Sequence, residues 1–212
     1  MNLEDLIQYY SNIKSLIELR LSEFLHIWKR ANEEFLFAEL CFCLCTPQSK
    51  AKSAQKAIRT LKQNKILYTG TADQIKIYLS GVRFHNNKSK YIIEARELFK
   101  KNNHIEVRSK INICNIKATR DWLVNNIKGL GYKEASHFLR NIGFGKDVTI
   151  QDRHILKNLK LLGVIDSIPK TLSPKKYFEI EDKMFEFSRN SNIPIDHLDF
   201  VLWHKEAGEV FK

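Results

Sequence analysis

Apolar residues recur at helical spacing along most of this chain, and no other feature constrains the fold as strongly. In residues 3–30, leucine, isoleucine and aromatic residues return every three or four positions, which is the spacing of one face of an α-helix. Only four prolines and eight glycines interrupt the 212 residues, and this scarcity favours long helices over many short strands. No segment shows a convincing strand pattern, so we predict an all-α fold.

The remaining helices are predicted from the same spacing and from local start and stop signals. The most apolar covers residues 35–45 and stops before Pro47, because proline disfavours helix in the residue before it. Thr71, with Gln74 three residues later, resembles a capping box. Residues 81–87 are expected to form a loop. The other expected helices cover residues 51–61, 88–101, 119–127, 133–142, 154–162, 176–188 and 196–205.

The charge balance indicates a polyanionic partner. Lysine and arginine number 35 against 24 acidic residues, which gives a formal net charge of +11. Nucleic acid is the leading candidate for such a partner, and an acidic membrane surface is its main competitor. Charge alone does not separate the two.

Nothing in the sequence predicts secretion or a membrane anchor. The first residues lack the basic start and apolar stretch of a secretory signal, and the apolar run at 35–45 is too short to span a bilayer. Three of the four cysteines crowd into that run, and their pattern does not resemble a secreted disulfide framework. We therefore expect a reduced cytoplasmic protein with no membrane partner, and cysteines that pack in the core without binding metal.

A glycine-rich turn between two amphipathic helices is the most informative local motif. Glycine permits positive φ angles and close approach of the backbone to another molecule, and the following helix starts with free N–H groups that suit a phosphate oxygen. This arrangement indicates a helix-hairpin-helix, which binds a DNA backbone without reading sequence. An ordinary αα-hairpin is the alternative. The turn residues are Lys128, Gly129, Leu130, Gly131 and Tyr132.

Lys133 and Asp152 are the candidate catalytic pair. Lys133 opens the second helix of the hairpin, and Asp152 follows after one helix and a short polar loop. A helix of about ten residues spans about 15 Å, and the loop can then return the chain toward the lysine. The alternatives are a solvated charge for Lys133 and a helix N-cap for Asp152. The capping and catalytic roles of Asp152 are compatible.

Residues 128–141, together with Asp152-Arg153-His154, resemble the archaeal-type 8-oxoguanine DNA glycosylase/AP lyase family, often called the second Ogg family. This family belongs to the helix-hairpin-helix superfamily of DNA glycosylases. The resemblance extends along most of the chain and includes Thr46, Arg83-Phe84 and residues 199–203. The loop before Asp152 departs from the pattern, because it is polar and lacks the proline of the superfamily name.

The resemblance implies a bifunctional enzyme that excises 8-oxoguanine from duplex DNA. The uncharged amine of Lys133 would attack the sugar C1′ of an extruded nucleotide and displace the base. The resulting Schiff base permits β-elimination, which cuts the strand on the 3′ side of the lesion. Asp152 would stabilise the positive charge that develops on the sugar. This chemistry requires no metal and no cofactor.

Nucleotide extrusion requires further residues around the lesion. We expect Gln48 or Ser49 to act as the wedge that fills the gap, and Arg83 to probe the widowed base. Phe84 and Trp203 are candidate stacking walls for the flipped base. A plain surface loop is the alternative for Gln48, Ser49, Arg83 and Phe84, and core packing is the alternative for Trp203.

The resemblance also implies that the last residue, Lys212, discriminates 8-oxoguanine from guanine; a frayed tail is the alternative. It further implies two helical subdomains with an active-site cleft between them. The central barrel subdomain would cover residues 32–140 and end in the helix-hairpin-helix at 119–142. The second would combine residues 1–31 and 141–212, and would carry Asp152 and the base-recognition tail.

Some members of the superfamily carry an iron–sulfur cluster on four cysteines near the C-terminus. No cysteine follows Cys114 in this sequence, so we expect no such cluster. We expect a monomer that is associated with the nucleoid if the source is a prokaryote. The competing interpretations are a glycosylase for another oxidised base, a non-enzymatic helix-hairpin-helix DNA-binding protein, and a basic RNA-binding or membrane-surface protein.

Overall fold

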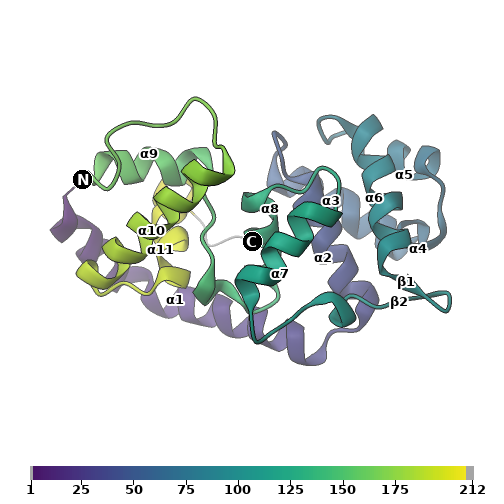
Figure 1. Cartoon of the computed structure of the whole chain (residues 1–212), viewed down its shortest axis with the longest axis horizontal. Helices are drawn as coiled ribbons and strands as arrows, with labels where there is room; N and C mark the ends of the chain where they lie inside the picture. Colours follow the sequence, from purple (N-terminus) through teal and green to yellow (C-terminus); the bar gives the residue numbers. More distant parts are fainter. Residues whose placement is uncertain (1, 209–212) are drawn as a thin grey trace. The chain divides into compact units, whose positions relative to one another are not determined.

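The computed structural model describes residues 2–208, and these residues form an almost entirely helical protein (Figure 1). The helices are α1 (Leu3–Arg30), α2 (Glu33–Cys45), α3 (Ala51–Gln63), α4 (Ile66–Thr69), α5 (Ala72–Tyr78), α6 (His85–Phe99), α7 (Ile116–Asn126), α8 (Tyr132–Asn141), α9 (Arg153–Leu161), α10 (Pro174–Ser191) and α11 (Ile195–Ala207). The strands are β1 (Lys100–Lys101) and β2 (His104–Ile105). The all-α prediction is confirmed.

Three local features differ from the prediction. Helix α6 begins at His85, inside the expected loop, because the amides of Asn87 and Lys88 both donate to the carbonyl oxygen of Phe84. The single-turn helix α4 was not predicted. The pair β1–β2 was not predicted either, because two residues per strand are too few to show an alternating pattern. Asn102 and Asn103 close this small hairpin with positive φ angles, which suit a two-residue hairpin turn.

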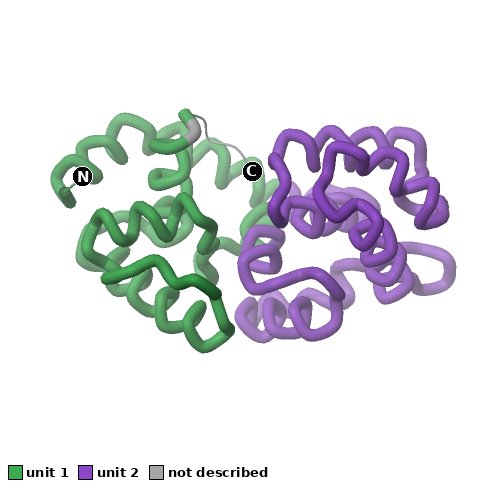
Figure 2. The backbone as a smooth tube through the Cα atoms, turned by 90° about the horizontal axis from the view of Figure 1, so that it is seen from above, with its two compact units in different colours: residues 1–26, 139–212 green, residues 27–138 purple. Residues whose placement is uncertain are grey.

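The chain folds into two compact units (Figure 2). Unit 1 contains the described residues of Met1–His26 and Leu139–Lys212, and unit 2 contains Ile27–Phe138. The boundaries between the units fall inside α1 and α8. The roles predicted for two subdomains stay a prediction.

The core of unit 2 is built around α2. Every residue from Leu36 to Cys45 is buried, and α2 packs against α3 and α6. The side chain of Asn32 starts the helix by accepting a hydrogen bond from the Phe35 amide at 2.9 Å. Cys41, Cys43 and Cys45 are all buried in this core, and burial raises the pKa of the Cys45 thiol to about 12. These cysteines therefore serve as small apolar core residues.

The core of unit 1 forms where the apolar faces of its helices meet. Helix α11 packs against α9 and α10, and the rings of Phe24 in α1 and Phe200 in α11 stack with centroids 6.1 Å apart. Gly143 follows α8 with a φ of +96°, and a Cβ atom there would lie 2.9 Å from the Leu25 Cα. Only glycine allows this close approach of α1.

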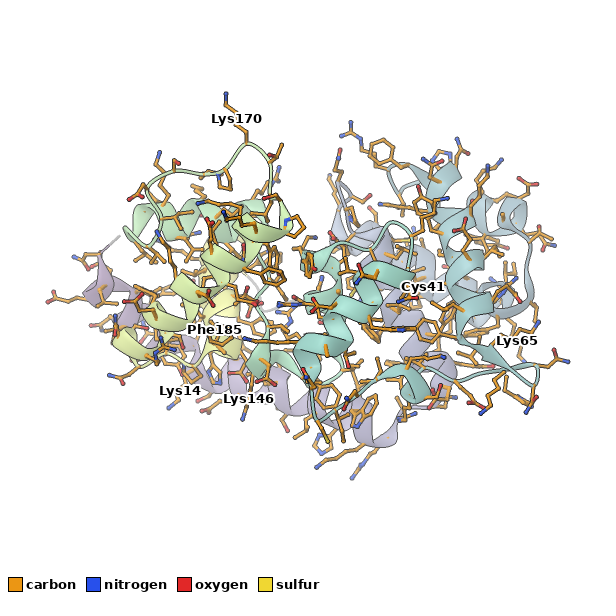
Figure 3. The ribbon with its side chains drawn as sticks, viewed as in Figure 1. Lys14, Cys41, Lys65, Lys146, Lys170 and Phe185 are labelled. Atoms are coloured by element: carbon orange, nitrogen blue, oxygen red, sulfur yellow. The ribbon has the colours of Figure 1, made fainter. Side chains whose placement is uncertain are left out.

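Exposed lysines lie on both units. Figure 3 labels Lys14, Lys146 and Lys170 in unit 1 and Lys65 in unit 2, and all four side chains are exposed, whereas Cys41 lies in the core of unit 2. Across residues 2–208, no helix combines the length and apolar character that a membrane crossing requires.

Candidate active site

The predicted helix-hairpin-helix is present as α7, the turn at 127–131 and α8 (Figure 1). The amide of Leu130 donates to the Ile127 carbonyl oxygen at 3.2 Å and closes the turn. Gly129 has a φ of +82°, and a Cβ atom at this position would lie 2.4 Å from the Tyr91 ring. Glycine is therefore required here both by the backbone angle and by the neighbouring ring.

The turn residues divide into exposed and buried side chains. Lys128 is exposed, and its amine lies 5.5 Å from the centroid of the Tyr91 ring and 3.8 Å from a carboxylate oxygen of Glu94. The side chain of Leu130 is buried in unit 2, so only its backbone is available to a ligand at the turn. The first amides of α8 follow directly and point out of the helix start, where an anion binds favourably.

Buried contacts hold the two helices of the hairpin together. Arg120 of α7 is 1% exposed, and its guanidinium donates to Ser136 Oγ of α8 at 3.3 Å. The same guanidinium lies 5.6 Å from the Tyr132 ring centroid. His137 is buried against the edge of the Phe42 ring, with centroids 5.6 Å apart. His137 is therefore a packed helix residue.

Lys133, the second residue of α8, is only partly accessible. Its side chain is 24% exposed, and its Nζ lies 2.8 Å from Glu134 Oε1. The Glu134 side chain is itself only 11% exposed. It folds back over the turn: a Cβ atom added to Gly131 would lie 3.0 Å from Glu134 Oε2. Lys133 is thus held in one place by a shielded carboxylate and is not a freely solvated charge.

Four residues that were predicted separately lie together in two paired loops, residues 46–49 and 81–84. The amide of Arg83 donates to Ser49 Oγ at 2.9 Å, which joins the loops. Gln48 is exposed, whereas the hydroxyl of Ser49 accepts the hydrogen bond that joins the two loops. Phe84 is 50% exposed, and the Arg83 guanidinium lies 5.2 Å from its ring centroid. Gln48 is therefore the better candidate wedge of the two that were proposed.

Asp152 lies in unit 1 and caps α9, as the alternative interpretation expected. Its Oδ1 accepts hydrogen bonds from the amides of His154 at 2.8 Å and Ile155 at 2.9 Å. Both bonds use the same oxygen, so they leave Oδ2 for a second partner.

The loop before Asp152 is fixed by a buried polar network with α10. Glu181 accepts hydrogen bonds from the Thr149 amide and hydroxyl, both at 3.0 Å. The side-chain amide nitrogen of Gln151, Nε2, donates to Thr149 Oγ1 at 3.1 Å and to the Tyr177 carbonyl oxygen at 2.9 Å. The Tyr177 hydroxyl in turn donates to the Thr149 carbonyl oxygen. The polar residues of this loop therefore fix its shape without the proline that the superfamily name implies.

A buried ion pair lies between the end of α8 and α11. Arg140 Nη1 donates to Asp199 Oδ2 at 2.7 Å, and both side chains are at most 10% exposed. Burial raises the pKa of Asp199 to about 6, against the opposing effect of Arg140, and the charges of Asp196 and Asp152 raise it further. Trp203, one turn later on α11, is partly exposed. Lys212 lies outside the described residues.

Several of these residues could not be found from the sequence. Glu134 carried a weak signal, because an acidic residue in the first helical turn is favourable. Asp199 belongs to the segment 199–203 that resembles the family, but its pairing with Arg140 was not predicted. Glu181 and Tyr177 carried no signal, because their partners are distant in the chain and only folding brings them together. The pairing of Lys133 with Asp152 stays a prediction.

The family model described as 8-oxoguanine DNA glycosylase matches residues 17–193 of this chain. The chain belongs to the 8-oxoguanine DNA glycosylase family. The resemblance inferred from the hairpin is thus confirmed.

Relatives and solved structures agree with this membership. A protein of Fusobacterium nucleatum named 8-oxoguanine DNA glycosylase/AP lyase is 48% identical over 96% of this chain and 94% of its own length. The Methanocaldococcus jannaschii 8-oxoguanine glycosylase/lyase, solved in complex with a 15mer DNA containing 8-oxoguanine, has a TM-score of 0.86 and 35% identity, covering 98% of this chain and 99% of that one. The 8-oxoguanine DNA glycosylase of Thermotoga maritima has a TM-score of 0.86 and 31% identity, covering 99% of this chain and 98% of that one.

Proposed function

We propose that this protein is a bifunctional 8-oxoguanine DNA glycosylase/AP lyase of base excision repair. The observation that supports this most directly is the position of Lys133, on the first turn of α8 immediately after a glycine turn suited to DNA phosphates. Relatives that align along nearly the whole chain are named for the same two activities.

In the proposed reaction, the neutral Nζ of Lys133 attacks C1′ of the extruded nucleotide. The bond from C1′ to the base breaks, and the base leaves with the proton that the attacking amine gives up. The C1′–O4′ bond of the attached sugar then breaks to give a protonated Schiff base. β-Elimination removes a proton from C2′ and breaks the C3′–O bond, which cuts the strand. Asp152 stabilises the positive charge on the sugar through the oxygen that does not cap α9.

We propose that the hairpin binds the DNA backbone through Lys128 and the amides of Gly129, Leu130 and Gly131. Gln48 fills the space left by the extruded nucleotide, with Ser49 supporting its loop. Arg83 probes the opposite base. The base pocket is formed by Phe84, Trp203 and Lys212, of which the two aromatic residues stack on the flipped base.

We also propose that the protein acts as a monomer in the cytoplasm, on the nucleoid if the cell is prokaryotic. The proposed chemistry uses an amine and a carboxylate, and it needs no metal, cofactor or iron–sulfur cluster. The sequence supports the absence of an iron–sulfur cluster near the C-terminus, because no cysteine follows Cys114.

The decisive experiment assays one duplex containing 8-oxoguanine for base release and strand scission, with wild type and Lys133→Gln side by side. We expect borohydride to trap a covalent protein–DNA adduct with the wild type, and Lys133→Gln to lose the adduct and both activities, because no Schiff base can form. Denaturing gels and chromatography of the released base measure these outcomes.

Lys128→Gln is the matched control, because it removes a lysine of the same hairpin. It should weaken DNA binding and still form the adduct at saturating protein. An adduct that persists in Lys133→Gln would refute the assignment of the nucleophile. Excision of an oxidised pyrimidine in preference to 8-oxoguanine would replace the proposed substrate.

A further inference from the structure

Lys88 differs from the exposed lysines of this basic protein because it is buried. The residue is 4% exposed although it lies in the first turns of α6. Its Nζ donates to the carbonyl oxygens of Cys45 at 2.9 Å and Pro47 at 2.8 Å, and it lies 3.4 Å from Ser49 Oγ. An ammonium has three donors, so these three acceptors match its whole capacity.

This arrangement assigns Lys88 a role inside the protein. Cys45 is the last residue of α2, whose carbonyl end carries partial negative charge that favours a cation. Burial lowers the pKa of Lys88, which shows the cost of removing this amine from water. An amine that is enclosed and fully bonded in this way is not available to a DNA phosphate.

Two of the three contacts of Lys88, those with Pro47 and Ser49, lie in the first of the paired loops, residues 46–49. Ser49 Oγ lies at the junction, because it meets Lys88 Nζ and also accepts the hydrogen bond from the Arg83 amide at 2.9 Å. Lys88 therefore contacts the 46–49 loop directly and reaches the 81–84 loop through Ser49. These loops carry the proposed wedge and the proposed probe of the opposite base.

The same loops contain two strained residues. Gln48 has a φ of +55° and Phe84 has a φ of +60°. Each left-handed conformation costs on the order of 1 kcal/mol for a residue other than glycine, and it persists only where surrounding contacts hold it. The side-chain hydrogen bonds of Lys88 and Ser49 are among the contacts that hold these loops, and the Ser49–Arg83 bond joins one loop to the other.

We propose that Lys88 is a positioning residue that locks the paired loops into one rigid surface for extruding the damaged nucleotide. The inference rests on the proposed function, since it concerns the step that precedes attack by Lys133. It predicts that loss of the Lys88 amine impairs base extrusion more than it impairs the chemistry at the sugar.

The test compares Lys88→Met with Lys90→Met at saturating protein and in single turnover. Methionine keeps much of the length of lysine without the donors, and Lys90 is an exposed lysine of the same helix. Each variant is assayed on a duplex with 8-oxoguanine and on one with a preformed abasic site, where no base has to be unstacked. We expect Lys88→Met to slow base excision by roughly tenfold to a hundredfold, the usual effect of misplaced groups, and abasic-site cleavage by less than about threefold.

A second readout follows extrusion without chemistry. In the Lys133→Gln background, 2-aminopurine beside the lesion should brighten when the nucleotide leaves the stack, and Lys88→Met should reduce this signal at full occupancy. Ser49→Ala, which removes only the junction hydroxyl, should shift both readouts in the same direction by a smaller factor. Thermal denaturation shows whether each variant is folded.

The outcomes separate the two proposals. Wild type that fails to excise 8-oxoguanine rejects the proposed function and this inference together. Active wild type with equal loss of both activities in Lys88→Met, or with no loss in either, overturns the positioning role alone. Unchanged 2-aminopurine signals in Lys88→Met and Ser49→Ala would overturn it as well. If Lys88→Met is too unstable to assay, an unchanged signal in Ser49→Ala overturns it alone.

Discussion

Asp152 contributes to the structure independently of any catalytic role. Its Oδ1 caps α9 through two amides, and replacing an N-cap aspartate with alanine typically costs about 1 kcal/mol. An activity loss in an alanine variant would therefore mix lost folding stability with lost electrostatic stabilisation. Asparagine caps helices about as well as aspartate, so it is the substitution that removes the charge alone.

Asp199 should make stability depend on pH in a way that reveals its burial. Its pKa is about 6 in the folded protein against 3.8 for the ordinary group, so the folded state binds a proton more readily between these values. The contribution of Asp199 to the free energy of unfolding should therefore grow as the pH falls through 6, by roughly 2 kcal/mol between pH 7 and pH 4.5. Urea denaturation of wild type and Asp199→Asn at both pH values measures this.

Asp182→Asn serves as the control for this experiment, because Asp182 is exposed on α10 in the same unit. The stability of wild type relative to Asp199→Asn should rise toward acid pH, while the difference from Asp182→Asn should stay flat. Parallel pH profiles for wild type and Asp199→Asn would contradict the raised pKa.

At the scale of elements, the helix-hairpin-helix depends on one backbone angle and one close approach. Gly129 combines a positive φ with a Tyr91 ring that leaves no space for a Cβ atom. The turn also sets where Lys133 leaves the start of α8. Its distortion should therefore affect both the proposed phosphate binding and the position of Lys133, the proposed nucleophile.

Gly129→Ala should lower DNA affinity and should destabilise the protein by more than the roughly 1 kcal/mol that a positive φ alone costs a residue with a side chain. Gly163→Ala separates the cost of the positive φ from the cost of the clash with Tyr91, because Gly163 has a φ of +72° but no atom lies within 4 Å of the added methyl. Calorimetry and fluorescence anisotropy measure stability and affinity. Equal effects of the two substitutions would show that Tyr91 does not restrict the turn.

At the scale of the whole molecule, a net charge of +11 should make DNA binding strongly dependent on salt. Lysines that contact phosphates displace counterions, so the logarithm of the affinity falls linearly with the logarithm of salt concentration. Lys128→Gln should reduce this slope by about one unit. Anisotropy titrations from about 50 to 200 mM salt provide the measurement.

Lys65→Gln is the control for a general loss of charge, because Lys65 is exposed at the start of α4, away from the hairpin in the sequence (Figure 3). It should leave the slope unchanged. A wild-type affinity that does not respond to salt, or a preference for anionic vesicles over duplex DNA, would favour the membrane-surface interpretation.

The sequence by itself determined the all-α class, most helices, the hairpin and the candidate nucleophile. These follow from local chemistry: helical spacing, glycine at a turn, and the capping ability of Thr71 and Asp152 all act within a few residues. The capping box at Thr71 is present as predicted. Where the local signal was weak, as at α4 and the start of α6, the prediction failed.

Only the tertiary structure decided which distant residues share a neighbourhood. Nothing in the sequence indicated that Lys88 is buried, and only folding placed its amine beside the carbonyl oxygens of Cys45 and Pro47. The loops of Gln48 and Phe84 are likewise joined only in the folded protein, by the hydrogen bond between Ser49 and Arg83. Burial and long-range hydrogen bonds depend on packing between elements, which no spacing along the chain encodes. For this reason Lys133 could be proposed as the nucleophile from the sequence, whereas the contacts that hold the paired loops became known only from the structure.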